Sequence, residues 1–198
     1  MLPEPSIDYI PPGWWNELKE NKLVVHVTQG TIANNPDDLI IPTLQALANE
    51  DLLVVATTGG KPIETIKLTQ IPTNARIETF IPHYHLLPHV DVMITNGGYG
   101  GVQMALAHGI PLIAAGKSED KPEICALIKY SGVGINLKTK TPTPTQIIKA
   151  FKQLMLNTNY QKKAQFIQSK MQSLDAPTIA VNLLQNLAAT KQPIFRND

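Results

Sequence analysis

Short runs of apolar residues alternate along this chain with segments of helical periodicity. Strands that are apolar throughout and are joined by helices are typical of a parallel sheet covered on both faces. The sequence therefore predicts an α/β fold, a doubly wound parallel sheet followed by C-terminal helices. The strands are expected at 23–28, 52–57, 75–80, 90–95, 110–114 and 134–137, and the helices at 37–49, 102–108, 123–130, 145–157, 160–174 and 177–189.

The composition fits one soluble globular domain. Of the 198 residues, 43% are hydrophobic and 17% are charged, which suits a packed core. The formal net charge of +1 gives no electrostatic case for nucleic acid or an anionic membrane. No run approaches the ~18–20 apolar residues of a membrane span. The single cysteine, Cys125, excludes an internal disulfide and predicts a cytoplasmic protein with a buried thiol.

The chain divides into three parts. Residues 1–22 are rich in proline and form an arm that we expect to be the linker from a missing N-terminal domain. Trp14 and Trp15 lie in this arm and are expected to pack on this domain or on the missing neighbour. Residues 23–190 form the predicted domain and 191–198 a tail. In the segment 138–145, Thr145 is expected to cap the next helix.

A glycine-rich turn follows the fourth predicted strand and opens a helix. The first N–H groups of a helix have no intrahelical partner, and the helix dipole attracts anions. Glycines let an oxyanion approach that backbone closely. The turn therefore favours a phosphate site, although tight packing alone could also require glycine. Its residues are Asn96, Gly97, Gly98, Tyr99, Gly100 and Gly101.

A second turn, Thr28-Gln29-Gly30-Thr31, ends the first predicted strand. In doubly wound sheets, ligands bind outside the carboxyl ends of the strands, so Gly30, Thr31 and the glycine-rich turn could clasp one diphosphate. The glycine-rich turn lacks the spacing of a Walker loop, and the one Gly-Lys-Ser of the chain, at 116–118, has Pro111 where that loop has its first glycine. The first strand–helix unit lacks Gly-x-Gly-x-x-Gly, which disfavours nicotinamide dinucleotides.

Three close histidines, His83, His85 and His89, raise the alternative of a metal site. Zinc needs three or four ligands, and no nearby cysteine or second histidine pair supplies the rest, so we predict no metal. No Gly-x-Ser-x-Gly elbow supports a hydrolase. His26 lies inside the first strand and is expected to be buried or at an interface.

The block from Phe80 to Lys121 resembles the donor-binding signature of the UDP-glucuronosyl/UDP-glucosyl type of glycosyltransferase, which includes plant, mammalian and macrolide-modifying enzymes. The resemblance covers roughly residues 22–187. It implies the GT-B fold, in which two Rossmann-like domains face a cleft and the second binds the nucleotide sugar. It also implies inverting transfer without a metal or another cofactor.

The resemblance assigns roles to several residues. Phe80 takes the place of an aromatic that stacks on uracil, with an ordinary core residue as the alternative, and His83 stands where the family has Gln. Asn96 replaces a histidine that contacts the diphosphate together with the amides after it, and the Asn96 amide can still donate a hydrogen bond to a phosphate oxygen. Gly100 and Gly101 replace a polar pair.

Two further positions concern the sugars of the donor. Met104 replaces a glutamate that binds the ribose. Asp120 and Lys121 stand where an Asp-Gln pair binds the sugar hydroxyls, with a solvated acidic loop as the alternative.

These assignments imply a function and its partners. The chain is expected to bind a UDP- or dTDP-sugar and to need an N-terminal acceptor-binding domain or subunit, which holds the general base. The two-domain protein would transfer a hexose to a lipophilic or natural-product acceptor, whereas the isolated chain would be inactive. The alternative is a non-catalytic nucleotide-binding or partner-interaction module.

Overall fold

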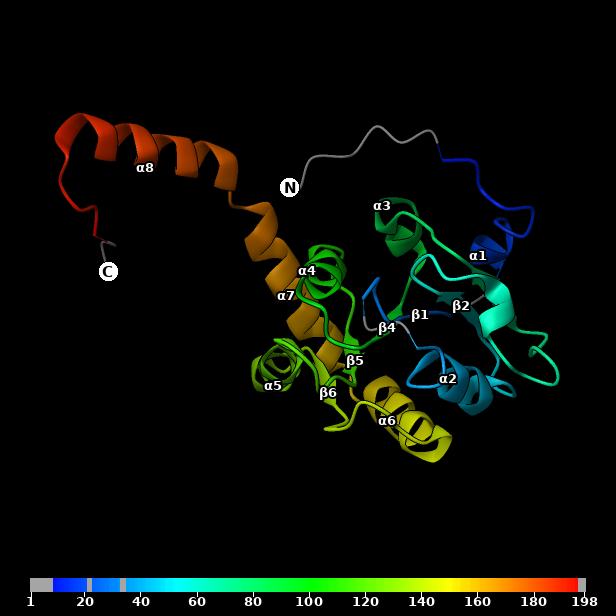
Figure 1. Ribbon diagram of the computed structural model, residues 1–198. Coiled ribbons are helices and arrows are strands. Elements are labelled where there is room, and N and C mark those ends of the chain that lie inside the picture. The colour runs from blue at the N-terminus through cyan, green and yellow to red at the C-terminus, as the bar shows by residue number, and fades with distance from the viewer. Residues whose placement is uncertain (1–8, 21–22, 33–34, 196–198) are drawn as a thin grey trace.

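The computed structural model describes residues 9–20, 23–32 and 35–195, and it contains one six-stranded sheet (Figure 1). All neighbouring strands pair in parallel, in the order β3-β2-β1-β4-β5-β6. The predicted α/β doubly wound sheet is confirmed, and each strand bound lies within two residues of its expected place. The strands are β1 (Val24–Thr28), β2 (Leu53–Thr57), β3 (Ala75–Glu78), β4 (Val92–Thr95), β5 (Leu112–Ala114) and β6 (Gly134–Asn136).

The helices follow the prediction, with several differences. The short elements α1, α3, η1 and η2 were not predicted, because one turn is too short to show helical periodicity. Helix α2 begins at Ile40 rather than at 37. Helix α4 begins at Tyr99 rather than at 102, so the last glycines of the turn are helical. The helices are α1 (Glu17–Glu20), α2 (Ile40–Leu47), α3 (His83–Leu86), α4 (Tyr99–Ala107), α5 (Lys121–Ser131), α6 (Pro144–Leu156), α7 (Asn159–Gln172) and α8 (Ala176–Thr190), with the 3-10 turns η1 (Ile63–Thr65) and η2 (Leu87–His89).

The cap of α6 also differs from the prediction. Thr143, not Thr145, is the N-cap, and its hydroxyl accepts from the amide of Gln146 while the Gln146 side chain accepts from the amide of Thr143. This reciprocal pair satisfies two donors at once, so it fixes the helix start two residues before the expected cap.

Two apolar cores lie on opposite faces of the sheet. Helices α2 and α6 cover one face, with Leu44 and Phe151 among its buried residues. Helices α1, α3, α4, α5 and α7 contribute to the other, which includes Met93, Val102 and Cys125. Because strand side chains alternate between faces, Val25 and Val27 of β1 enter the first core.

Trp14 and Trp15 pack on this domain, which was the first of the two expected arrangements. Both lie against the second core, and the Trp14 indole Nε1 donates to Oε1 of Glu78 at 2.8 Å. The Trp15 ring lies 6.1 Å from the His89 ring. Residues 1–8 and 21–22 of the predicted arm, and 196–198 of the predicted tail, lie outside the described residues.

Helix α8 differs from every other long helix. It projects away from the sheet and the other helices (Figure 1), and none of its residues is buried. Its apolar side chains are therefore exposed, including Ile179, Leu184 and Leu187.

Candidate functional site

Strands β1 and β4 are neighbours at the centre of the sheet, although β2 and β3 separate them in sequence. The chain leaves β1 toward α2 on one face and leaves β4 toward α4 on the other. Such a reversal opens a crevice at the carboxyl ends of the two strands, where ligands of doubly wound folds bind. The two predicted turns therefore meet at this switch point.

Asn96 joins the two turns directly. Its side-chain Nδ2 donates to the backbone carbonyl of Gln29, and its Oδ1 accepts from the amide of Gly98 at 3.2 Å. The residue is buried. The structure thus gives the Asn96 amide a role in holding the crevice together, and its predicted contact with phosphate stays a prediction.

The start of α4 presents backbone amides at the crevice. Helix geometry leaves the N–H groups of Tyr99, Gly100 and Gly101 without intrahelical acceptors, and Gly98 supplies no side-chain cap. A Cβ atom built on Gly100 would meet no atom within 4 Å, so the space beside this turn is open. An oxyanion could approach the positive end of the helix there.

Gly97 is the point at which the glycine-rich turn packs against α5. Its φ of 83° lies in the left-handed region, and a Cβ atom built on it would lie 2.6 Å from Sγ of Cys125. Only glycine therefore fits between the turn and α5. As predicted, Cys125 is buried, and burial raises the pKa of its thiol.

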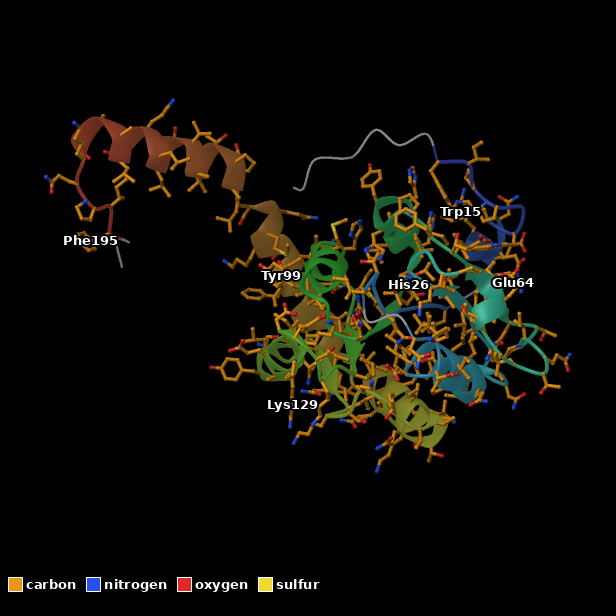
Figure 2. All side chains as sticks on the ribbon, in the orientation of Figure 1. Trp15, His26, Glu64, Tyr99, Lys129 and Phe195 are labelled. Atoms are coloured by element: carbon orange, nitrogen blue, oxygen red, sulfur yellow. The ribbon has the colours of Figure 1, made fainter. Side chains whose placement is uncertain are left out.

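A pair of histidines lies beside the first turn of α4. A Cβ atom built on Gly101 would lie 3.7 Å from Cε1 of His83, and the His83 ring lies 5.5 Å from the His26 ring. His26 is buried, as expected, and its Nε2 lies 3.1 Å from Oγ1 of Thr57. Its Nδ1 has no hydrogen-bond partner among the described residues. Figure 2 places His26 in the centre of the molecule.

Both imidazoles are neutral near pH 7 for the same reason. Burial lowers the pKa of His26 well below its ordinary value, and the neighbouring His83 adds to the effect. Burial also lowers the pKa of His83, with a smaller contribution from His108. His83 is therefore able to contact a ligand as a neutral donor or acceptor.

Phe80 is not a core residue, which removes that alternative. Its side chain is 59% exposed where the chain crosses from β3 toward α3, while the following Ile81 is buried. An exposed aromatic ring at this edge of the sheet could stack on a base.

The turn after β1 packs closely against its neighbour after β2. Gly30 has a φ of 72°, and a Cβ atom on Gly59 would overlap the Gly30 carbonyl. The Gln29 side chain, which sequence reasoning missed, accepts from the amide of Ile40 at 3.3 Å and so fixes the start of α2. Thr31 is exposed beside it.

Asp120 and Lys121 lie at the start of α5 and have different environments. Asp120 is the exposed N-cap residue and its side chain makes no cap hydrogen bond, so it is open to a ligand. Lys121 is only 6% exposed and pairs with Glu119. The charge that Lys121 brings is therefore largely neutralised by its neighbour.

A small open cleft of about 40 Å³ lies next to the glycine-rich turn. Gly116 is essential to its floor, because a Cβ atom there would overlap the Asn96 carbonyl and lie 2.8 Å from Cβ of Lys121. Lys117 and Lys140 were missed, because loop residues show no periodicity that places them at a site. The lining residues are Gln29, Asp38, Asn96, Ala115, Gly116, Lys117, Ser118, Lys121 and Lys140.

The other predicted histidines have separate contacts. His85 stacks on Tyr9 with ring centroids 5.2 Å apart, while His89 faces Trp15. In the described part of the chain, no group of three or more His, Cys, Asp or Glu side chains could hold a metal ion. Across the same residues, no helix has both the length and the apolar character that a membrane crossing requires.

Comparison with known proteins agrees with this geometry. Residues 42–187 match the family model of the erythromycin biosynthesis protein CIII-like C-terminal domain. The chain is 46% identical over 180 residues to 4'-demethylrebeccamycin synthase of Lentzea aerocolonigenes, covering 91% of this chain and 42% of that protein. It is 37% identical over 188 residues to UDP-glucosyltransferase A1 of Starmerella bombicola, covering 94% and 41%.

Solved structures show the same fold. The glycotransferase of kitacinnamycin matches with a TM-score of 0.78 at 20% identity, covering 93% of this chain and 47% of that one. The calicheamicin glycosyltransferase CalG4 matches with a TM-score of 0.76 at 22% identity, covering 86% and 44%.

The fold and the crevice define a Rossmann-like domain of the GT-B glycosyltransferase type. The chain belongs to the erythromycin biosynthesis protein CIII-like C-terminal domain family. It spans about 42% of the length of the curated relatives described above.

Proposed function

We propose that this chain binds the nucleotide sugar of a glycosyltransferase, with the donor's diphosphate at the start of α4. The observation that carries the proposal is the position of that helix: its free amides open into the crevice between β1 and β4. The exposed ring of Phe80 would stack on the base. His83, Gly30 and Thr31 would line the nucleotide, and Asp120 and Lys121 the sugar.

The reaction proposed for the whole protein needs a second domain. With an N-terminal acceptor-binding half that supplies the general base, the protein would transfer a hexose from a UDP- or dTDP-sugar to a lipophilic or natural-product acceptor in the cytoplasm. We propose inversion at the anomeric carbon and no metal. The names of the relatives support the reaction class, and the isolated chain would bind donor without transferring it.

Helix α8 supports the need for a second domain. It is 15 residues long, carries no charged residue and buries none of its side chains. Leu183 and Leu187 are each 46% exposed and lie one helical turn apart. An uncharged helix with such a stripe gains stability from burial, and the N-terminal half is the partner that the length of the relatives suggests.

Calorimetric titration with UDP, dTDP and GDP, and then with their sugars, tests the proposal. Gly100→Asp is the sharpest variant, because it places a carboxylate in open space at the first turn of α4. A carboxylate there favours the helix but repels a diphosphate. We expect nucleotide affinity to fall at least tenfold in Gly100→Asp and to fall much less in the neutral control Gly100→Asn.

Absence of binding by every nucleotide would contradict the proposal and favour a non-catalytic partner-interaction module. One observation favours that second function. Met104 packs against the second core at the position where the resemblance places a ribose-binding glutamate. If Gly100→Asp and Gly100→Asn bound the nucleotide with equal affinity, the diphosphate would not lie at the start of α4.

A further inference from the structure

The near-neutral total charge of the chain conceals two oppositely charged parts. From residue 124 to residue 174 there is no Asp, Glu or Arg, but there are eight lysines. The rest of the chain holds 9 basic and 16 acidic residues, which is a net charge of −7 against +8. The eight are Lys129, Lys138, Lys140, Lys149, Lys152, Lys162, Lys163 and Lys170.

Two of these lysines are paired with acidic residues near α2. Lys140 lies 3.4 Å from Asp38, and Lys152 lies 3.1 Å from Glu50. Lys129 of α5 and the lysines of α7 are different, because they enter none of the described ion pairs and are exposed. Figure 2 shows Lys129 at the outer surface beside α5.

Four of the unpaired lysines lie on α5 and α7, where α7 passes the end of α5. Gly132 ends α5, and a Cβ atom built on it would lie 3.7 Å from Cγ of Lys163. Lys162, Lys163 and Phe166 line an open hollow of about 550 Å³ on α7. We call the surface formed by Lys129, Tyr130, Lys162, Lys163, Phe166 and Lys170 the lysine face.

Aromatic side chains stand out between these lysines. Tyr130 is 90% exposed and Phe166 is 57% exposed. The Lys170 Nζ lies 5.6 Å from the centre of the Phe166 ring. Lysines interleaved with exposed aromatic rings suit a surface that attracts anionic headgroups and inserts apolar groups at the lipid boundary. Nucleic-acid surfaces instead favour arginine, which this segment lacks.

The lysine face lies opposite the donor crevice. Helix α5 starts at the carboxyl edge of the sheet, beside Gly116, and ends just before β6 starts, which is the amino edge. Gln161 of α7 also donates to the carbonyl of Gly109, just before β5. A surface at the amino edge can therefore be occupied without covering the crevice at the carboxyl edge.

We propose that the lysine face docks this chain on an anionic membrane surface, as a peripheral contact without a membrane span. The inference is independent of whether the crevice binds a nucleotide. Because the attraction is electrostatic, it is expected to weaken as the Debye length falls from about 10 Å at 0.1 M salt to about 3 Å at 1 M.

Vesicle co-sedimentation tests this proposal on the whole chain. We expect binding to mixed phosphatidylserine–phosphatidylcholine vesicles and little to phosphatidylcholine alone. The variant with Lys129, Lys162, Lys163 and Lys170 changed to Gln is expected to lose at least tenfold in affinity. The matched control changes Lys138, Lys140, Lys149 and Lys152 to Gln, removes the same charge, and is expected to stay within about threefold.

A second variant tests the contribution of the aromatic rings to vesicle binding separately from that of the lysines. Tyr130→Ser with Phe166→Ser keeps every lysine and is expected to weaken vesicle binding several-fold, with an unchanged melting temperature because both rings are exposed. Equal losses in the two lysine variants would overturn the lysine face as the contact. Equal binding to neutral vesicles, or binding to an RNA oligonucleotide but not to anionic vesicles, would overturn the membrane as the partner.

Discussion

The side chain of Asn96 donates a hydrogen bond to the backbone carbonyl of Gln29, across the switch point between β4 and β1. Both residues are buried, so this bond holds the two turns together within the protein itself. The crevice is therefore formed before any ligand enters, which reduces the ordering that binding requires.

Replacing Asn96 by Ala is expected to destabilise the domain by about 1–3 kcal/mol, because a buried carbonyl loses its donor. Urea unfolding followed by circular dichroism measures this change. Asn182→Ala, on the exposed face of α8, is the control and is expected to change stability by less than about 0.5 kcal/mol. A loss no larger than the control's would show that the bond is not needed.

Two glycines of the site are expected to respond oppositely to alanine. Gly116→Ala forces a methyl group into the Asn96 carbonyl and should cost about 1–3 kcal/mol. Gly100→Ala adds a methyl group in open space in a helix and should be neutral or stabilising by up to about 1 kcal/mol. Chemical denaturation of both variants checks the pair, and similar effects would contradict the packing described for Gly116.

Phe80→Ala is expected to weaken UDP binding by roughly tenfold or more, since base–aromatic stacking contributes about 1–3 kcal/mol. Phe166→Ala is a matched control, because its ring is 57% exposed against 59% for Phe80 and lies at the other edge of the sheet. Calorimetry measures both affinities. An unchanged affinity in Phe80→Ala would remove the ring from the nucleotide site.

Stability is expected to fall as the pH drops below about 6.5, the ordinary histidine value. The pKa values of His26 and His83 are lowered in the folded state, so the unfolded chain binds more protons in this range. Stability is thus complete above that pH and is lost as the pH falls through the folded values. Melting temperatures between about pH 7.5 and 5 measure the slope, which should flatten in His26→Val. An unchanged slope would show that His26 does not cause it.

The sheet was predictable because its strands are apolar on both faces, a pattern that few other structures produce. The glycine-rich turn was also located correctly, since a strand followed by clustered glycines points to one edge of the sheet. The start of α4 was placed three residues late, because Gly100 and Gly101 disfavour a helix by propensity yet lie in its first turn.

Other parts of the site depend on contacts distant in sequence. Gln29 and Asn96 are 67 residues apart, and no local pattern indicates that one amide would serve the other turn. Lys117 and Lys140 come together in one cleft only because β5 and β6 are neighbours in the sheet.

The thiol of Cys125 lies under Gly97, in a chain with no other cysteine. A reagent reaches that sulfur only when the turn lifts from α5. The rate at which Cys125 is alkylated therefore reports how often the turn opens, without any label being introduced. Any ligand that binds at the start of α4 should slow the alkylation of Cys125, whether or not the chemical identity of that ligand is known.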